Sequence, residues 1–277
     1  DEMPFSVLGS LEQLAGKQLL VLPDIARIPK MQAALIDAFA RAGGTVLATG
    51  GTAQGKGSAP LQCLGVANVR ETRRGLRSSM LEIPGAERAT FPRCVQAPYV
   101  DFGDELLCID PSGGAKTYLR LIPEHPFGPP ECCCFTKKEE IPGLVVSPCG
   151  FGRGVYLPWK GGALYQREGL ANPFLFLQDV LFGFCGVQDL APGLTPMVEL
   201  VLCQKEEQLV VQLVNGTGCF ANSWFAPVPV RDIHLSLPGV SGAVRTLNGG
   251  RLTVQEKSGA LEVVLDVLDE YEAIVIQ

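Results

Sequence analysis

The sequence predicts two domains, an α/β domain with a parallel sheet followed by an all-β sandwich. Residues 19–50 show a strand, an amphipathic helix and a second strand, a pattern typical of a parallel sheet with a right-handed crossover. Residues 198–277 show only short strand patterns separated by turn signals. The loop DLAPGLTP at 189–196 lies between these regions, so we expect domains at 1–189 and 190–277.

The first strand, helix and strand follow from apolar runs and breakers. The run LLVLP at 19–23 is continuously apolar, which predicts a strand covered on both faces. Pro29 begins a helical pattern that ends in a left-handed cap at Gly43-Gly44, and TVLATG at 45–50 is the second buried strand. The helix residues expected to share the buried side are Met31, Ala34, Leu35, Ala38 and Phe39.

From about residue 64 to 160, short alternating runs replace the helical pattern, and we expect them to extend the sheet as antiparallel strands. The stretch 123–142, rich in Pro and Cys, is expected to be a surface excursion. A helix is predicted over 172–186, with Asn172 as N-cap, Pro173 as its first residue and Gly186 as its end. We expect this helix to cover the sheet.

The all-β region has the strand spacing of a β-sandwich. Turn signals NGTG, LNGG and KSG separate its runs. The expected strands are VELVLCQ, QLVVQLVN, VRDIHLSLP, GAVRTL, LTVQ, ALEVVLD and EAIVIQ.

Composition excludes several classes of protein. The chain of 277 residues is 47% hydrophobic and 19% charged, as in globular proteins. A net charge of −6, with no basic run beyond Lys137-Lys138, indicates that it binds neither nucleic acid nor anionic membranes. Apolar stretches such as FLFLQDVLFGF are shorter than the roughly 20 residues of a membrane span.

The start, DEMPFSVLG, is acidic and lacks the pattern of a signal peptide. Because there is also no initiator methionine, we expect an excised part of a longer protein. Free cysteines, read as small buried hydrophobes, indicate a reducing compartment, and we expect a cytoplasmic location.

The ten cysteines do not predict a metal site. They form no CxxC pair, and the only histidines, His125 and His234, are not at ligand spacing. Neighbouring side chains in Cys132-Cys133-Cys134 point to opposite faces of an extended segment, so they do not converge on one ion. We expect no metal and no cofactor.

Cys149, in SPCGFGRG, admits two interpretations. A catalytic thiol at a strand-to-helix turn would need a following helix and a nearby histidine. GFGRGVYLPW instead reads as a glycine turn leading into another strand, which favours a hairpin residue. For that residue we expect an ordinary or raised pKa and no histidine partner.

Two further patterns are weaker as sites. The loop ATGGTAQGKGS at 48–58 resembles a phosphate loop but breaks the required glycine spacing, so a loop at the sheet edge is favoured. The acidic groups Asp101, Asp104 and Glu105, and Asp269, Glu270 and Glu272, could serve a glycosidase, whose carboxyl groups flank the scissile bond. Their close spacing favours solvated faces or turns, and we assign no catalytic residue.

The segment VYLPWKGGALYQREG supplies the candidate binding residues. Aromatic faces stack on sugar rings and polar groups orient hydroxyls, so a loop carrying Gly161-Gly162 could present a saccharide or subunit contact. Packing of the aromatic residues in the core is the alternative. The candidates are Trp159, Tyr165, Gln166 and Arg167.

The segment KQLLVLPDIARIPKMQAALIDAFARAGGTVLATGGT resembles the opening of the amidotransferase-like domain of β-galactosidase trimerisation type found in family 42 glycoside hydrolases and in fucosidase-like relatives. GRGVYLPWKGGALYQREG is similar to a later segment of that domain, and LVVQLVNGTG, PVPVRDIHLSLPGVSGAVRTLNGG and LDEYEAIVIQ are similar to the terminal β-domain. The resemblance implies a flavodoxin-like fold related to class I glutamine amidotransferases, without their catalytic thiol. It also implies an accessory role, since the catalytic acid and nucleophile of such enzymes lie on a barrel outside this sequence.

The leading hypothesis is therefore a non-catalytic C-terminal accessory and oligomerisation region of a glycoside hydrolase, with a contribution to a carbohydrate site. An independent enzyme of the same fold with a cysteine nucleophile is one alternative, and a freestanding carbohydrate-binding module is another. The expected partners are copies of the same chain and carbohydrate.

Overall fold

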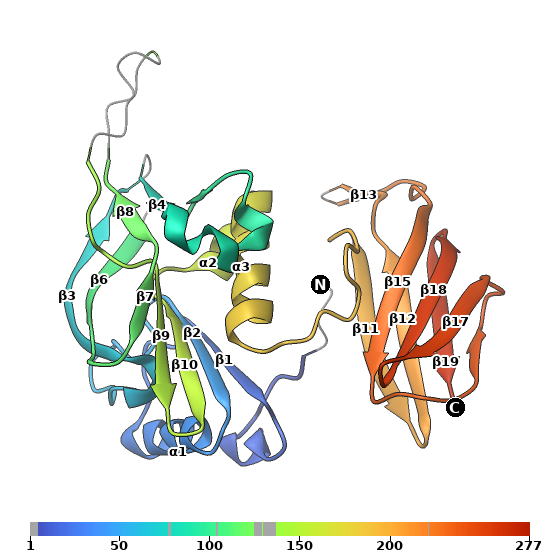
Figure 1. The fold of residues 1–277 in the computed structure, drawn as a ribbon, viewed down its shortest axis with the longest axis horizontal. Helices are drawn as coiled ribbons and strands as arrows, with labels where there is room; N and C mark the ends of the chain where they lie inside the picture. The colour runs from blue at the N-terminus through green and yellow to red at the C-terminus, as the bar shows by residue number, and fades with distance from the viewer. Residues whose placement is uncertain (1–4, 77–78, 104, 125–128, 130–136, 221) are drawn as a thin grey trace. The chain divides into compact units, whose positions relative to one another are not determined.

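The computed structural model describes residues 5–76, 79–103, 105–124, 129, 137–220 and 222–277. The chain divides into two compact units, an α/β unit of Leu8–Val187 and a β-unit built mainly from Gln188–Gln277 (Figure 1). Buried apolar residues form separate clusters in each unit. The predicted order, an α/β domain followed by an all-β sandwich, is confirmed.

The central sheet of the α/β unit has the strand order β1-β2-β10-β9-β7. Strands β1 (Leu19–Pro23), β2 (Thr45–Thr49) and β10 (Gly152–Leu157) are parallel to one another. Strand β9 (Leu144–Cys149) is antiparallel to both of its neighbours, β10 and β7 (Lys116–Tyr118). Helix α1 (Lys30–Arg41) connects β1 to β2 and ends before Gly43, whose φ of 117° requires a residue without Cβ. The predicted strand, helix and parallel strand are confirmed.

The buried side of α1 differs from the expected one. Met31 is 79% exposed and Leu35 is 49% exposed, whereas the buried residues are Ala33, Ile36, Asp37 and Ala40. Alanines on the buried side let the helix lie close to the sheet, and the Asp37 carboxylate accepts the backbone N–H of Cys63 at 2.9 Å. Strand β1 is at the sheet edge and Val21 is 46% exposed, so the expectation of cover on both faces was also wrong.

The opposite face of the sheet is covered by helix α3 (Ala171–Asp179), which continues as a π-helical turn, Val180–Phe184. Phe176, Val180 and Phe184 pack in one core with residues of β2 and β10. The predicted helix is confirmed, but its N-cap is Leu170. Asn172 instead accepts the N–H of Asp101 and donates to the carbonyl of Tyr99, so its side chain anchors a neighbouring strand.

The middle of the chain forms small sheets beside the central one. Strand β3 (Val66–Arg74) pairs with β6 (Glu105–Pro111), and β4 (Met80–Glu82) lies between β5 (Tyr99–Val100) and β8 (Arg120–Ile122). Of the strands expected to extend the sheet in antiparallel orientation, β7, β9 and β10 join the central sheet, and the expectation was wrong for β10, which pairs with β2 in parallel. Short 3-10 helices are found at Leu11–Leu14, Gln62–Leu64, Gly85–Thr90 and Pro92–Cys94.

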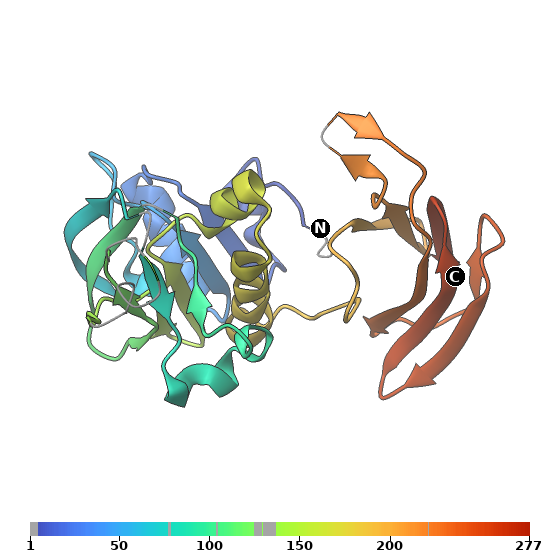
Figure 2. The same ribbon diagram turned by 90° about the horizontal axis from the view of Figure 1, so that it is seen from above.

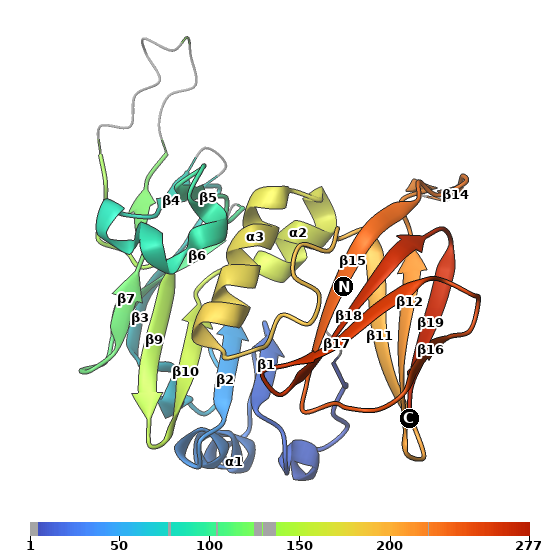
Figure 3. The ribbon, with the colours of Figure 1, turned by 45° about the vertical axis from the view of Figure 1, so that its right-hand side comes forward.

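In the β-unit, one sheet has the order β11-β12-β19-β16 and the other β15-β18-β17 (Figure 3). Their inner faces share one apolar core, to which Val211 and Ile274 contribute from the first sheet and Leu235 and Val263 from the second. The expected strands are all present: β11 (Val198–Lys205), β12 (Gln208–Asn215), β15 (Val230–Pro238), β16 (Val244–Thr246), β17 (Leu252–Lys257), β18 (Ala260–Leu268) and β19 (Tyr271–Ile276).

A short additional hairpin, β13 (Cys219–Phe220) and β14 (Ser223–Trp224), stands off from the two sheets of the β-unit (Figure 2). The aromatic side chains on and beside it are exposed: Phe220 by 77%, Trp224 by 78% and Phe225 by 68%. Within the described ranges, no helix is long and apolar enough to cross a membrane.

Candidate functional site

Cys149 lies at the end of β9, opposite Gly152 of β10, in a tight hairpin. Gly150 in the turn has a φ of 61°, and a Cβ there would meet the Arg41 carbonyl oxygen at 2.5 Å. Burial raises the pKa of the Cys149 thiol, and the charge of Asp37 raises it further. The predicted hairpin is confirmed. The direction of the pKa shift agrees with the predicted ordinary or raised pKa, so a reactive thiolate is disfavoured.

Within the described part of the chain, no histidine influences Cys149. His234 lies on β15 of the other unit, and His125 lies outside the described residues, as do Cys132, Cys133 and Cys134. No group of three or more metal-ligating side chains is found among the described residues.

The carboxyl ends of the parallel strands are the usual place for a ligand in an α/β fold. In this chain the polar side chains at that edge form hydrogen bonds and an ion pair within the protein. Asp24 accepts the N–H of Gly51 at 2.7 Å and pairs with the Lys160 ammonium at 2.9 Å, while the Tyr156 hydroxyl donates to the carbonyl of Gly50. A ligand at this edge would have to displace these contacts.

The glycine-rich loop after β2 is also tied into the fold. The N–H of Ala53 donates to the carbonyl of Ile25, and the N–H of Gly55 to that of Ala26. The Ser58 hydroxyl accepts the N–H of Ile28. Amides used in this way do not converge on a phosphate, which agrees with the broken glycine spacing.

Trp159 lies in the core of the α/β unit. It is 0% exposed, its indole N–H donates to the carbonyl of Gly143 at 2.9 Å, and its ring packs at 5.8 Å from that of Phe176. The position agrees with the core-packing alternative. A ring enclosed in this way offers no face on which a sugar could stack.

The other candidates lie on helix α2 (Gly161–Glu168), not on the expected loop. Gly161 is buried, and a Cβ on it would lie 3.1 Å from the ring of Trp159, so this glycine permits packing and not ligand approach. Tyr165 stacks on Phe174 with ring centroids 5.0 Å apart. Gln166 and Arg167 are exposed, and Arg167 pairs with Glu168. The structure thus groups Tyr165, Gln166 and Arg167 and separates them from Trp159.

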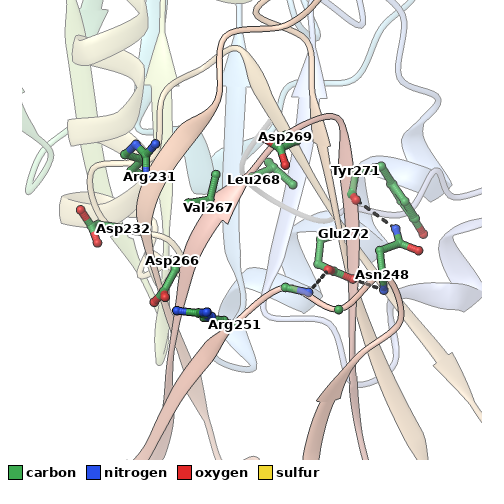
Figure 4. Close-up of a pocket in the computed structure, with 12 residues that line it drawn as sticks. Arg231, Asp232, Asn248, Arg251, Asp266, Val267, Leu268, Asp269, Tyr271 and Glu272 are labelled. Atoms are coloured by element: carbon green, nitrogen blue, oxygen red, sulfur yellow. Dashed lines mark hydrogen bonds between the residues drawn. The ribbon is translucent and has the colours of Figure 1, made fainter.

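A groove of about 700 Å³ in the β-unit was not anticipated from the sequence (Figure 4). Leu268, which is buried, and Val267 contribute its apolar part. Tyr271, 42% exposed, adds an aromatic ring at its border. The exposed charged and amide side chains along the groove are Arg231, Asp232, Asn248, Arg251, Asp266 and Asp269.

The backbone beside the groove is irregular at two facing aspartates. The ladder between β15 and β18 pairs Arg231 with Val267 and Ile233 with Leu265, but omits Asp232 and Asp266. Asp232 has a φ of 53°, and the N–H of Asp266 turns to the carbonyl of Arg251. A left-handed non-glycine residue and two like charges placed opposite each other are both unfavourable, so this segment departs from a regular strand pair.

Glu272 holds the other wall of the groove. Its carboxylate, 4% exposed, accepts the backbone N–H groups of Leu247, Asn248 and Gly250 at 2.9–3.1 Å. The expectation of a solvated or turn position was therefore wrong for Glu272, although Asp269 and Glu270 are exposed. The LNGG turn was the sequence feature that could have indicated this role, because its backbone amides need a hydrogen-bond acceptor. The acceptor, Glu272, lies more than twenty residues further along the chain, so the sequence did not identify it.

The second acidic group, Asp101, Asp104 and Glu105, was also expected in a turn or on a solvated face, and the structure agrees for Asp101. Asp101 accepts the N–H of Gly103 at 3.0 Å, which is a local turn contact. Asp104 lies outside the described residues, and Glu105 pairs with Arg74 at 2.7 Å. These groups therefore stabilise a turn and a strand end.

No protein-family model and no curated protein sequence matches the chain. Among solved structures, α-L-fucosidase isoenzyme 2 from Paenibacillus thiaminolyticus is similar over 95% of this chain and 41% of its own, with a TM-score of 0.68 and 16% identity. The β-galactosidase from Bacillus circulans sp. alkalophilus is similar over 95% and 34%, with a TM-score of 0.57 and 12% identity. A β-galactosidase from the haloarchaeon Halorubrum lacusprofundi covers 95% and 32%, at a TM-score of 0.53 and 17% identity.

The chain therefore spans less than half the length of the solved proteins it resembles. Nearly all of it superimposes in order on part of each, across both the α/β unit and the β-unit. The fold of this chain, an α/β domain followed by a β-domain, is one found within an α-L-fucosidase and within β-galactosidases.

Proposed function

We propose that this chain is the non-catalytic C-terminal accessory region of a longer glycoside hydrolase and that it serves in assembly. The observation that carries the proposal is the match of 94–95% of the chain to 31–41% of solved α-L-fucosidase and β-galactosidase chains. Because the chain matches only a minor part of these enzymes, we assign it an accessory role and assign catalysis to the part of the parent enzyme that lies outside this chain.

The chemistry of the α/β unit supports the absence of catalysis. Cys149 is in a hairpin turn with a raised pKa, and Asp24 and Lys160 pair with each other at the carboxyl edge of the sheet. The described cysteines Cys63, Cys94, Cys108, Cys149, Cys185, Cys203 and Cys219 are free thiols, as in a reducing compartment, which supports a cytoplasmic parent enzyme.

The hairpin β13–β14 supports self-association, with a second copy of this chain as the occupant of its aromatic surface. The segment 215–230, NGTGCFANSWFAPVPV, carries no charged residue in a chain that is 19% charged. A symmetric contact must complement itself, and an uncharged apolar patch does so, whereas a charged patch repels its own copy. Three exposed aromatic side chains offer a few hundred Å² of apolar surface, the scale of functional patches.

Turnover assays test the absence of catalysis. The chain is incubated with chromogenic β-galactoside, chromogenic α-L-fucoside and glutamine, in parallel with Cys149→Ser. We expect no product above the buffer rate from either protein. Hydrolysis by the wild type that the Cys149→Ser variant loses would establish the alternative, an independent enzyme with a cysteine nucleophile.

A further inference from the structure

We propose that the groove of the β-unit binds a neutral saccharide. Its volume of about 700 Å³ lies within the range of roughly 300–1,000 Å³ found for small-molecule sites. Polar side chains from β15, from β18 and from the turn between β16 and β17 line it. Arg231, Asp232, Asp266 and Arg251 lie along one flank in Figure 4, and Asn248, Tyr271 and Glu272 lie along the other.

The groove carries both hydrogen-bond donors and hydrogen-bond acceptors, and this combination suits the hydroxyl groups of a ligand better than it suits a ligand with a single charged group. Guanidinium groups such as those of Arg231 and Arg251 only donate, and ionised carboxylates such as Asp232 and Asp266 only accept. A hydroxyl both donates and accepts, so neighbouring hydroxyls on one sugar ring satisfy both kinds of side chain. Within the described part of the chain these four groups form no ion pair, which leaves them available to a ligand.

Charges of both signs line the groove, two guanidinium groups beside a larger number of carboxylates, and this mixture disfavours a ligand that carries a single charge. An anion attracted by the two arginines would also meet Asp232, Asp266 and Asp269, and a cation attracted by these carboxylates would meet both guanidinium groups. A charged ligand in the groove would be repelled by the side chains of its own sign, whereas a neutral polyol is repelled by neither kind. The apolar atoms of Val267 and the exposed ring of Tyr271 suit the carbon face of a sugar.

One wall of the groove is pre-organised. Glu272 holds the backbone of the Asn248–Gly250 turn, and the Asn248 side-chain amide donates to the carbonyl of Tyr271 at 3.0 Å. Gly250 is required at its position, because a Cβ there would lie 2.7 Å from the Glu272 carboxylate. A fixed wall lowers the ordering cost of binding. The choice of galactose and fucose as probes rests on the proposed function, whereas the groove chemistry does not.

Titrations of the full chain labelled with ¹⁵N test the site. D-Galactose, L-fucose and lactose are the neutral probes, and D-galacturonate and D-galactosamine carry opposite charges on the galactose ring. We expect saturable shifts at the amides of Gly249, Gly250 and Arg251 with a neutral sugar in the millimolar range, and at least about tenfold weaker binding of galacturonate.

Arg251→Ala and Asp232→Asn are each expected to weaken binding about tenfold, since each removes one charged hydrogen-bonding group. Asparagine tolerates the positive φ of residue 232, so the second variant keeps the backbone. Arg245→Ala, an exposed arginine of β16 outside the groove, is the matched control and should bind like the wild type.

Three results would overturn the proposal: no saturable shift with any neutral sugar, shifts that map to α2 instead of the groove, or tighter binding of galactosamine than of galactose. The molar mass of the same samples is measured in parallel. If the chain self-associates but binds no sugar, the proposed saccharide site is refuted and the proposed assembly role is not. If the chain binds sugar as a monomer, the assembly role is refuted and the saccharide site is not.

Discussion

Trp159 and Trp224 are the only tryptophans of the chain, and their surroundings are opposite. Trp159 is 0% exposed with its N–H bonded to Gly143, whereas Trp224 is 78% exposed on a short hairpin. We predict that Trp159→Ala lowers the free energy of unfolding by about 3–5 kcal/mol, and that Trp224→Ala changes it by less than about 0.5 kcal/mol. Chemical denaturation of the two variants beside the wild type measures both values. Equal effects would contradict the burial described.

The sequence of Trp159 and its neighbours could not decide between core and surface. The aromatic residues of VYLPWKGGALYQREG fit either position, and the partners that bury Trp159, Gly143 and Phe176, are distant in sequence. Gly161-Gly162 was expected in a loop open to a ligand, yet α2 begins at Gly161, where an added Cβ would lie 3.1 Å from the indole ring of Trp159. Contacts with residues distant in sequence therefore determine that Trp159 is buried and that Gly161 begins a helix.

Cys149 should react slowly with thiol reagents. Burial raises its pKa, so little thiolate exists at neutral pH, while Cys203 is exposed on β11 and serves as the internal control. In the folded protein at pH 7 we predict that iodoacetamide modifies Cys203 well before Cys149, as followed by peptide mass spectrometry. Rapid stoichiometric labelling of Cys149 would restore the nucleophile hypothesis.

At the scale of elements, the β16–β17 turn depends on one buried carboxylate. Removing the Glu272 acceptor leaves the backbone N–H groups of Asn248 and Gly250 without their carboxylate partner, whereas the N–H of Leu247 keeps the carbonyl of Ala273. A buried donor left unsatisfied costs about 1–3 kcal/mol, and these two are partly buried. We predict that Glu272→Ala destabilises the protein by at least about 2 kcal/mol. The exposed neighbour Glu270→Ala is the control and should match the wild type in thermal unfolding.

The strand β3 is connected to the segment before β9 by an ion pair that responds to pH. Arg73 donates to Glu139 at 2.7 Å and Lys137 lies at 3.2 Å, and both hold the pKa of Glu139 below its ordinary value. A carboxyl group with a lowered folded pKa stabilises the fold above its unfolded value, about 4.3, and this stabilisation is lost as pH falls through the folded pKa.

Below about pH 4.3, the melting temperature of the wild type should therefore fall more steeply with pH than that of Glu139→Gln. Parallel pH profiles of the two proteins between neutral and acidic conditions measure the difference. Identical profiles would show that this pair adds no stability.

The hairpin β13–β14 is the element to which we assign self-association. Because Phe220 and Trp224 are exposed, replacing both by Ser should weaken association without lowering the melting temperature by more than a few degrees. Sedimentation velocity compares this double variant with Met31→Ser, which removes another exposed apolar side chain, on α1. Equal association of both variants would exclude the hairpin as the contact.

Elements with strong periodic patterns were predictable, and their packing partners were not. The β-unit strands and the β1-α1-β2 segment follow from apolar runs bounded by turn signals. The buried side of α1 was mispredicted because Met31 and Leu35 are the larger apolar residues, whereas the sheet accepts the smaller Ala33 and Ala40. The groove could not be predicted because its walls come from three segments that meet only in the folded sandwich.

At the scale of the molecule, we propose that the boundary near residue 190 separates two independently folding domains. Each unit has its own apolar core, which is the requirement for folding alone. Separately expressed fragments 1–189 and 190–277 should each unfold cooperatively and give dispersed amide spectra that match those of the full chain. A fragment that is unfolded alone would refute the boundary.

An assembly region associates with copies of itself, and the molar mass of this chain in solution reports that association. Light scattering after gel filtration, across a range of protein concentrations, should give an integral multiple of the chain mass of 29.6 kDa greater than one. The aromatic surface of β13–β14 is then buried between copies. A mass of 29.6 kDa at every concentration would contradict the account.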